Sequence, residues 1–290
     1  MERRSLHSLW KALQAVPFTQ IEEEARRPFS LALVGSKEQR ESALSFLFPV
    51  RQGAEIHPSR SLVLEYGGVP PNEGRAFDAI VVAGEARPEL VSLPNAYHLA
   101  HLGDWARLFD RMLQDRPDLA ASMARRLPGL RSLASAKVIT DAARANAKFA
   151  FSAGLPEVFP LTEILIPATV LADFFVITRN QAEMLLRLAA IHDLPANPAA
   201  RAHDLVPLLG NALGWRALAR AATALVPGGV GLVANAVFAY AGTIALGRSL
   251  ELYYRTGIQP QPAVVRRLFR EGLAEARRFV AHIRLNRLRR

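Results

Sequence analysis

A long uncharged stretch constrains the fold of this chain more than any other sequence feature. No charged residue occurs between Arg220 and Arg248, although 21% of all residues are charged. Such a stretch lies either in lipid or in the buried centre of a helical domain. Pro227-Gly228-Gly229 divides it, because proline and glycine break helices. The piece after this break, Val230–Gly247, is at the short end of the roughly 20 residues that a membrane span needs.

The uncharged stretch is expected to form the centre of a helical hairpin. Its arms would be residues 205–226 and 230–254, with Pro227-Gly228-Gly229 as the turn. The second arm is rich in alanine and glycine, which partition weakly into lipid but allow helices to pack closely. The candidates for contact with a membrane or a partner are Phe238 and Tyr240 of this arm and Pro227, Gly228 and Gly229 of the turn. At this stage either lipid or protein can cover the hairpin.

The sequence before this helical part has a different pattern of apolar residues. Short apolar runs at 30–35, 61–66, 79–84 and 96–102 predict strands, and helical patterns occur between them. Strands that alternate with helices indicate an α/β layer with a mostly parallel sheet. We therefore predict an α/β plus all-α protein. Its three parts are an amphipathic N-terminal helix at 1–27, split near Pro17, a small α/β domain at 28–117, and a helical domain at 118–290.

The first strand-to-helix turn invites comparison with a phosphate-binding loop. That motif is Gly-x-x-x-x-Gly-Lys-Ser/Thr, in which backbone N–H groups surround phosphates and the hydroxyl binds magnesium. Aligned on Gly35, the chain keeps the final hydroxyl as Ser42, but Arg40 replaces the second glycine and Glu41 replaces the lysine. Glu41 places a negative charge where a phosphate would lie. We therefore predict a degenerate, non-hydrolysing phosphate loop and assign no catalytic residue.

A divergent nucleotide-binding switch remains the alternative. In it, GTP and Mg²⁺ would be held by an unorthodox cradle. The candidate cradle residues are Gly35, Lys37, Arg40 and Ser42. The third predicted strand ends in Gly84-Glu85, without the aspartate that would hold magnesium there.

Metal and thiol chemistry have little support in the sequence. The chain contains no cysteine, which excludes disulfides, Cys-ligated zinc and a thiol nucleophile. His57, His98 and His101 lack accompanying carboxylates at ligand spacing. We therefore predict no metal site and no resident cofactor.

The C-terminal residues 263–290 predict one long basic helix. They include nine arginines but only two acidic residues, Glu271 and Glu275, within a chain of net charge +10. An amphipathic basic helix is suited to an anionic membrane surface or to a partner protein, although a bundle helix can also carry a solvated arginine face. Nucleic acid is not expected, because no reader fold or set of stacking aromatics is recognisable. The candidate contact residues are Arg266, Arg270, Arg277 and Arg284.

Three blocks of the C-terminal half occur in the order seen in a bacterial family. They are LADFFVITRNQAEMLLRLAAIHDL, GNALGWRALARAATALVPGG and FAYAGTIALGRSLELYY. This order resembles the YcjF-like bacterial domain of unknown function, which often follows a Ras-like GTPase domain. The resemblance implies that residues 28–117 are a degenerate GTPase-like partner, with a P-loop-like turn. The resemblance assigns no catalytic residues to this chain.

These observations together predict a non-catalytic, membrane-associated scaffold or adaptor, a pseudo-GTPase that acts through protein or lipid contacts. We expect it in the cytoplasm, at the inner face of the cell membrane, where it can form a homo-oligomer. The alternatives are the nucleotide-binding switch and a soluble structural subunit of a larger assembly.

Overall fold

The computed structural model describes most of the chain. The described residues are 15–49, 57–71, 76–84, 88–99, 103–153, 166–201, 204 and 231–288, and side chains are not described at 91, 153, 166–175, 231–232 and 280–288. The chain divides into two compact units. The α/β unit comprises Gln20–Ser135 and Ala190–Leu194. The helical unit comprises Met1–Thr19, Ala136–Ala189 and Pro195–Arg290.

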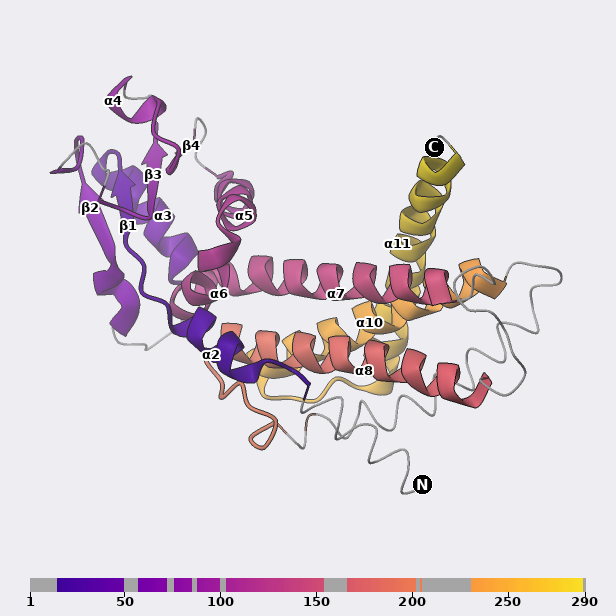
Figure 1. Ribbon diagram of the computed structural model, residues 1–290. Helices are drawn as coiled ribbons and strands as arrows, with labels where there is room; N and C mark the ends of the chain where they lie inside the picture. Colours follow the sequence, from indigo (N-terminus) through magenta and orange to yellow (C-terminus); the bar gives the residue numbers. More distant parts are fainter. Residues whose placement is uncertain are drawn as a thin grey trace. The chain divides into compact units, whose positions relative to one another are not determined.

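The α/β unit contains a four-stranded parallel sheet, as predicted (Figure 1). The strands are β1 (Leu31–Val34), β2 (Val63–Tyr66), β3 (Ala79–Ala83) and β4 (Ala96–Leu99). Their order is β2-β1-β3-β4. Every residue of β1 and β3 is buried, whereas β2 and β4, at the edges, each include exposed residues. Continuous apolar strands are typical of parallel sheets that are covered on both faces.

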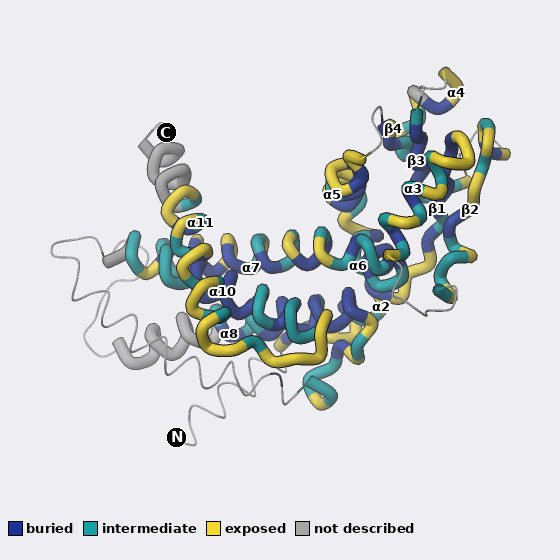
Figure 2. The backbone as a smooth tube through the Cα atoms, turned by 180° about the vertical axis from the view of Figure 1, so that it is seen from behind, coloured by how far each residue is buried: buried dark blue, intermediate teal, exposed yellow. Residues whose placement is uncertain are grey.

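The helices of this unit pack against the sheet and against one another through their apolar sides. On α5 the buried positions recur at helical spacing (Figure 2). Phe109 of α5 stacks on Phe46 of α3 with ring centroids 5.5 Å apart. The other sheet face packs against Leu90 of α4. The elements are α2 (Phe18–Arg26), α3 (Lys37–Leu47), η1 (Pro58–Leu62), α4 (Pro88–Val91), α5 (Trp105–Asp115), α6 (Pro117–Arg126) and η3 (Pro128–Leu130).

The α/β unit extends beyond the boundary that we predicted at residue 117. The reason is packing after Pro117: in η3, Gly129 lies so close to α3 that an added Cβ would be 1.8 Å from the carbonyl oxygen of Phe46. The helix α2 also belongs mostly to this unit and buries Ile21 and Ala25. Its start at Phe18 agrees with the predicted split at Pro17; residues 1–14 of the predicted N-terminal helix lie outside the described residues.

The helical unit is built from four long helices. They are α7 (Arg131–Ala153), α8 (Ile166–Ile191), α10 (Gly231–Thr256) and α11 (Pro262–Leu288), of which α7 and α8 each begin or end in the other unit. Gly247 of α10 allows three of these helices to approach closely, because its missing side chain leaves room for Ile139 of α7 and Met184 of α8. Figure 1 shows α7, α8 and α10 running alongside one another.

A buried polar network links the same three helices. The amide of Asn146 on α7 donates to the hydroxyl of Thr243 on α10 at 3.0 Å, and Asn180 on α8 donates to the Asn146 carbonyl at 2.9 Å. Asn146 and Thr243 are fully buried. Because an unpaired buried polar group is costly, this network favours one alignment of the three helices.

The last two helices form a hairpin of their own. The turn follows Thr256, where Gly257 adopts a positive φ of 72° and donates its N–H to the Tyr253 carbonyl at 2.7 Å. Gly257 thus caps α10, and glycine is the residue expected there because it adopts a positive φ without strain. α11 then folds back on α10, with Gly272 against the backbone of Ala241. The predicted hairpin about Pro227-Gly228-Gly229 cannot be compared, because its turn and its first arm lie outside the described residues.

Candidate functional site

The carboxyl edge of the sheet is the place where α/β proteins of this type usually bind ligands. Successive strands are added on opposite sides of β1, so the strand order reverses between β1 and β3. Open parallel sheets bind ligands at such a reversal, beyond the carboxyl ends of the strands. In this chain Gly35 follows β1 and Gly84 follows β3. The predicted phosphate loop therefore lies in the right place for a ligand.

The turn itself is too short to surround a phosphate. Only Gly35 and Ser36 separate β1 from α3, which begins at Lys37. Ser36 caps the helix and accepts a hydrogen bond from the Gln39 N–H, while the Gln39 side chain accepts one from the Ser36 N–H at 2.8 Å. This reciprocal capping box satisfies donors that a bound anion would otherwise use. Of the positions that we aligned with the motif, Arg40, Glu41 and Ser42 lie within α3.

The side chain of Gln39 lies against Gly35 and Gly84, at the carboxyl ends of β1 and β3. A Cβ added to Gly84 would lie 2.5 Å from Gln39 Nε2, and one added to Gly35 would lie 2.8 Å from Gln39 Oε1. Gly84 also has a φ of 90°, which disfavours any residue with a side chain. The two glycines thus accommodate a side chain of the protein itself at the point where a ligand would bind.

Arg40 lies next to Gly35, and its guanidinium group donates hydrogen bonds within the protein. Its Nη1 donates to the Gly35 carbonyl at 2.6 Å, and its Nε donates to Glu65 Oε2 at 3.1 Å. Glu65 also receives a hydrogen bond from Arg60. Burial would raise the pKa of Glu65, but the hydrogen bonds from Arg60 and Arg40 outweigh it and lower the pKa. The arginine that we proposed as a phosphate ligand is therefore paired with a carboxylate.

The other two candidate cradle residues, Ser42 and Lys37, lie in different surroundings. Ser42 accepts a hydrogen bond from Trp105 Nε1 at 2.9 Å, which ties α3 to α5. The Lys37 side chain is 84% exposed, with its Nζ 3.9 Å from Glu41 Oε1. Gly35 and Arg40 are brought together, whereas Lys37 and Ser42 are not directed to the same point.

Sequence reasoning missed Gln39 and Glu65. The Ser36-x-x-Gln39 spacing is a recognisable capping-box signature and indicates that a helix begins at once. No comparable local signal joins Arg40 to Glu65, because the two residues are far apart in sequence and meet only through the pairing of β1 with β2.

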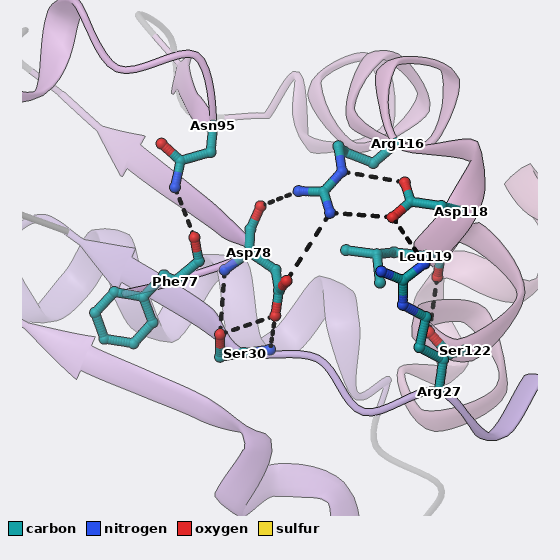
Figure 3. Close-up of polar contacts among 9 residues, drawn as sticks. All are labelled: Arg27, Ser30, Phe77, Asp78, Asn95, Arg116, Asp118, Leu119 and Ser122. Atoms are coloured by element: carbon teal, nitrogen blue, oxygen red, sulfur yellow. Dashed lines mark hydrogen bonds and ion pairs between the residues drawn. The ribbon is translucent and has the colours of Figure 1, made fainter. Parts of the chain in front are cut away.

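Polar residues at the opposite, amino edge of the sheet hold the strands together (Figure 3). The Asp78 carboxylate accepts hydrogen bonds from the Ser30 N–H and hydroxyl at 2.8 and 3.0 Å. Arg116 donates to Asp118 at 3.1 Å and to the Asp78 carbonyl. The hydrogen bonds from Arg116 lower the pKa of Asp118, and burial opposes them. This cluster joins the starts of β1 and β3 to the junction of α5 and α6, and each contact has a structural role.

The predicted contact residues of the helical unit divide into two groups. Phe238 stacks on Phe269 of α11 at 6.2 Å, and Tyr240 packs against Phe279 at 5.4 Å. Tyr240 is buried, and burial raises its pKa. Phe238 and Tyr240 thus both contact α11. Pro227, Gly228 and Gly229 lie outside the described residues.

The arginines of α11 form an exposed face. Arg266, Arg270 and Arg277 are exposed, and their spacing places them within about 40° of one another around the helix. Arg284 continues this row in the sequence, but its side chain is outside the described set. The two acidic residues of α11 are turned toward α10, where Arg248 lies 3.6 Å from Glu271 and 2.8 Å from Glu275.

The described part of the chain contains neither a membrane-spanning helix nor a cluster of metal ligands. None of its helices is both long and apolar enough to cross a membrane. Its histidine, aspartate and glutamate side chains form no group of three or more able to hold a metal ion.

Comparisons with models of known protein families, with curated proteins and with solved structures find no match for this chain. The resemblance to the YcjF-like domain therefore stays a prediction.

Proposed function

We propose that the protein is a non-catalytic adaptor that binds an anionic membrane surface through the arginine face of α11. The observation that carries the proposal is the separation of charge on this helix. Arg266, Arg270 and Arg277 are exposed, while Glu275 pairs with Arg248, and Glu271 pairs with Arg248 and with Arg267 of α11. The row of Arg266, Arg270 and Arg277 therefore presents positive charge, with the acidic residues of α11 on another side of the helix.

The apolar side of α11 is compatible with this arrangement. Phe269 and Phe279 contact α10, and Ala276 is fully buried. The described part of the helix thus uses its apolar side for packing, and we propose peripheral binding by charge. Such binding is stabilised by about 1 kcal/mol for each basic residue near an anionic surface, and salt weakens it.

The carboxyl edge of the sheet supports the non-catalytic part of the proposal. Gln39 lies against Gly35 and Gly84, Arg40 pairs with Glu65, and the start of α3 is capped by Ser36 and Gln39. We propose that the α/β unit is a degenerate relative of GTPase-like domains that has lost nucleotide binding. Calorimetry with GTP or ATP and Mg²⁺ should detect no binding. Nucleotide binding that is lost on Lys37→Ala would favour the switch instead.

Vesicle co-sedimentation of two matched triple variants tests the membrane part. One replaces Arg266, Arg270 and Arg277 with glutamine. Its control makes the same change of charge in the α/β unit. The control positions are Arg26, Arg107 and Arg111, all exposed.

The α11 variant should bind vesicles of phosphatidylserine and phosphatidylcholine on the order of 100-fold more weakly than the wild type, from about 1 kcal/mol per arginine. The control should bind much as the wild type does. Equal weakening in both variants would mean that net charge alone attracts the protein, and would refute a specific role for α11.

A further inference from the structure

Arg40, Arg60 and Glu65 form a compact ionic cluster in the α/β unit, separate from α11. Arg40 comes from α3, Arg60 from η1 and Glu65 from β2. Their side chains are 19%, 31% and 30% exposed, so the cluster is partly shielded yet open to solvent on one side. It lies next to Gly35, at the sheet edge where ligands bind in folds of this type.

The two arginines hold the Glu65 carboxylate as they would hold a phosphate. Arg40 Nε donates to one carboxylate oxygen, Oε2, and Arg60 Nη2 donates to the other, Oε1. Arginine pairs recognise phosphate oxygens with the same charge-assisted hydrogen bonds. Removing the negative charge of Glu65 would leave two adjacent guanidinium groups.

Each arginine is also anchored independently of Glu65. Arg40 Nη1 donates to the Gly35 carbonyl at 2.6 Å, and Arg60 Nη1 donates to the Val63 carbonyl at 3.2 Å. These backbone contacts remain when the carboxylate is absent. The positions of the two guanidinium groups are therefore largely set in advance, which reduces the cost of binding a ligand.

The end of β2 adjoins the cluster. Gly67 follows β2, and among the described residues a Cβ added there would meet Arg40 Nη1 at 3.8 Å. The guanidinium group of Arg40 therefore lies beside the point where the chain leaves β2.

We propose that Arg40 and Arg60 form a phosphate-binding site that is closed by Glu65 as an internal ligand. A phosphate group binds when the Glu65 carboxylate is displaced or neutralised. The hydrogen bonds from the arginines lower the pKa of Glu65 despite its burial, so the carboxylate stays charged and the site stays closed at neutral pH. This site does not depend on the proposed membrane contact.

Calorimetric titration of pyrophosphate into matched variants tests the proposal. Glu65→Gln removes the carboxylate charge with little change of shape. Glu41→Gln makes the same change beside Arg40, at a residue whose near cation is Lys37. We expect Glu65→Gln to bind pyrophosphate about tenfold or more tightly than the wild type and Glu41→Gln, from two charge-assisted contacts. The gain should disappear in Glu65→Gln/Arg40→Gln.

Two outcomes would overturn the proposal: equal binding by Glu65→Gln and Glu41→Gln, or a gain that survives Arg40→Gln. Glu65→Asp, which withdraws the carboxylate by one methylene, is the second variant if Glu65→Gln does not fold, and it should show a smaller gain. A parallel titration of GTP into Glu65→Gln identifies the source of the phosphate, since the wild-type site is closed and should bind no GTP. Tighter binding of GTP than of pyrophosphate by this variant indicates that the opened site accepts a nucleotide. Equal binding indicates a free oxyanion, and either gain must depend on Arg40.

Discussion

Replacing Gly129 with alanine should strongly destabilise the α/β unit. Gly129 lies in η3, and its added Cβ would be 1.8 Å from the Phe46 carbonyl oxygen, 2.8 Å from the Phe46 carbonyl carbon and 3.0 Å from Leu47 Cα. These are backbone atoms, which cannot rotate away as the end of a side chain does. Either η3 or the end of α3 must therefore move by more than about 1 Å to restore normal contact distances.

The loss of stability in Gly129→Ala can be estimated from the packing that such a movement disturbs. Phe46 is stacked on Phe109 at 5.5 Å, and Leu47 is completely buried. Overpacking of a dense core costs typically 1–3 kcal/mol and occasionally more. Because backbone is involved on the side of α3, we expect about 3 kcal/mol, which corresponds to a loss of about 10 °C in Tm for a domain of this size.

Thermal and urea unfolding, followed by circular dichroism, measure this effect. Gly68→Ala is the matched control, because a Cβ there would meet nothing within 4 Å and the residue has no positive φ. It should change the stability by less than about 0.5 kcal/mol. Equal stability of the two variants would show that η3 does not pack on α3, and would restore the end of the α/β domain to residue 117.

Three further predictions concern the two units. Asn146→Ala should cost about 2–4 kcal/mol, measured by urea unfolding, because it removes a donor to buried Thr243 and the acceptor of Asn180 and leaves a cavity. Gly247→Ala should cost about 1–3 kcal/mol by the same assay, since its Cβ would lie 2.7 Å from a side-chain atom of the neighbouring α7. Because its pKa is lowered in the folded state, Asp118 stabilises the protein above pH about 4 and loses this contribution as the pH falls through its lowered pKa. The urea midpoint of Asp118→Asn should therefore vary less between pH 7 and pH 3 than that of the wild type, and an unchanged pH dependence would contradict the role of the Arg116 contact.

Much of the fold could be predicted because its signals are local. The apolar runs that end at Gly35 and Gly84 became parallel strands, since such runs are buried from both faces. Pro128 marked the break before α7, and Gly257 marked the end of α10, because proline and glycine act on the backbone at their own positions.

The limits of the α/β unit could not be predicted in the same way. They depend on the contact between Gly129 and the end of α3, which composition does not encode. The pairing of α10 with α11 was not predicted either. The small residues before and after Pro227 instead favoured a hairpin between residues 205–226 and 230–254. The short turn at Gly257 was a usable signal for the pair observed.

The candidate site was predicted in position but not in content. Gly35 and Arg40 lie at the carboxyl edge, as expected. The capping role of Gln39 has a local signature and was recoverable from the sequence. The pairing of Arg40 with Glu65 was not, because it arises only when β1 and β2 align, and the bond from Trp105 to Ser42 likewise depends on tertiary packing.

The central claim is that exposed arginines of α11 bind an anionic membrane surface. Flotation of the purified wild-type protein with vesicles tests it most directly, using phosphatidylserine-containing and pure phosphatidylcholine vesicles over a series of salt concentrations. We expect the protein to float with the anionic vesicles only, and we expect this binding to fall steadily as salt rises. Failure to float with anionic vesicles at low salt, or equal flotation with both kinds of vesicle, would contradict it.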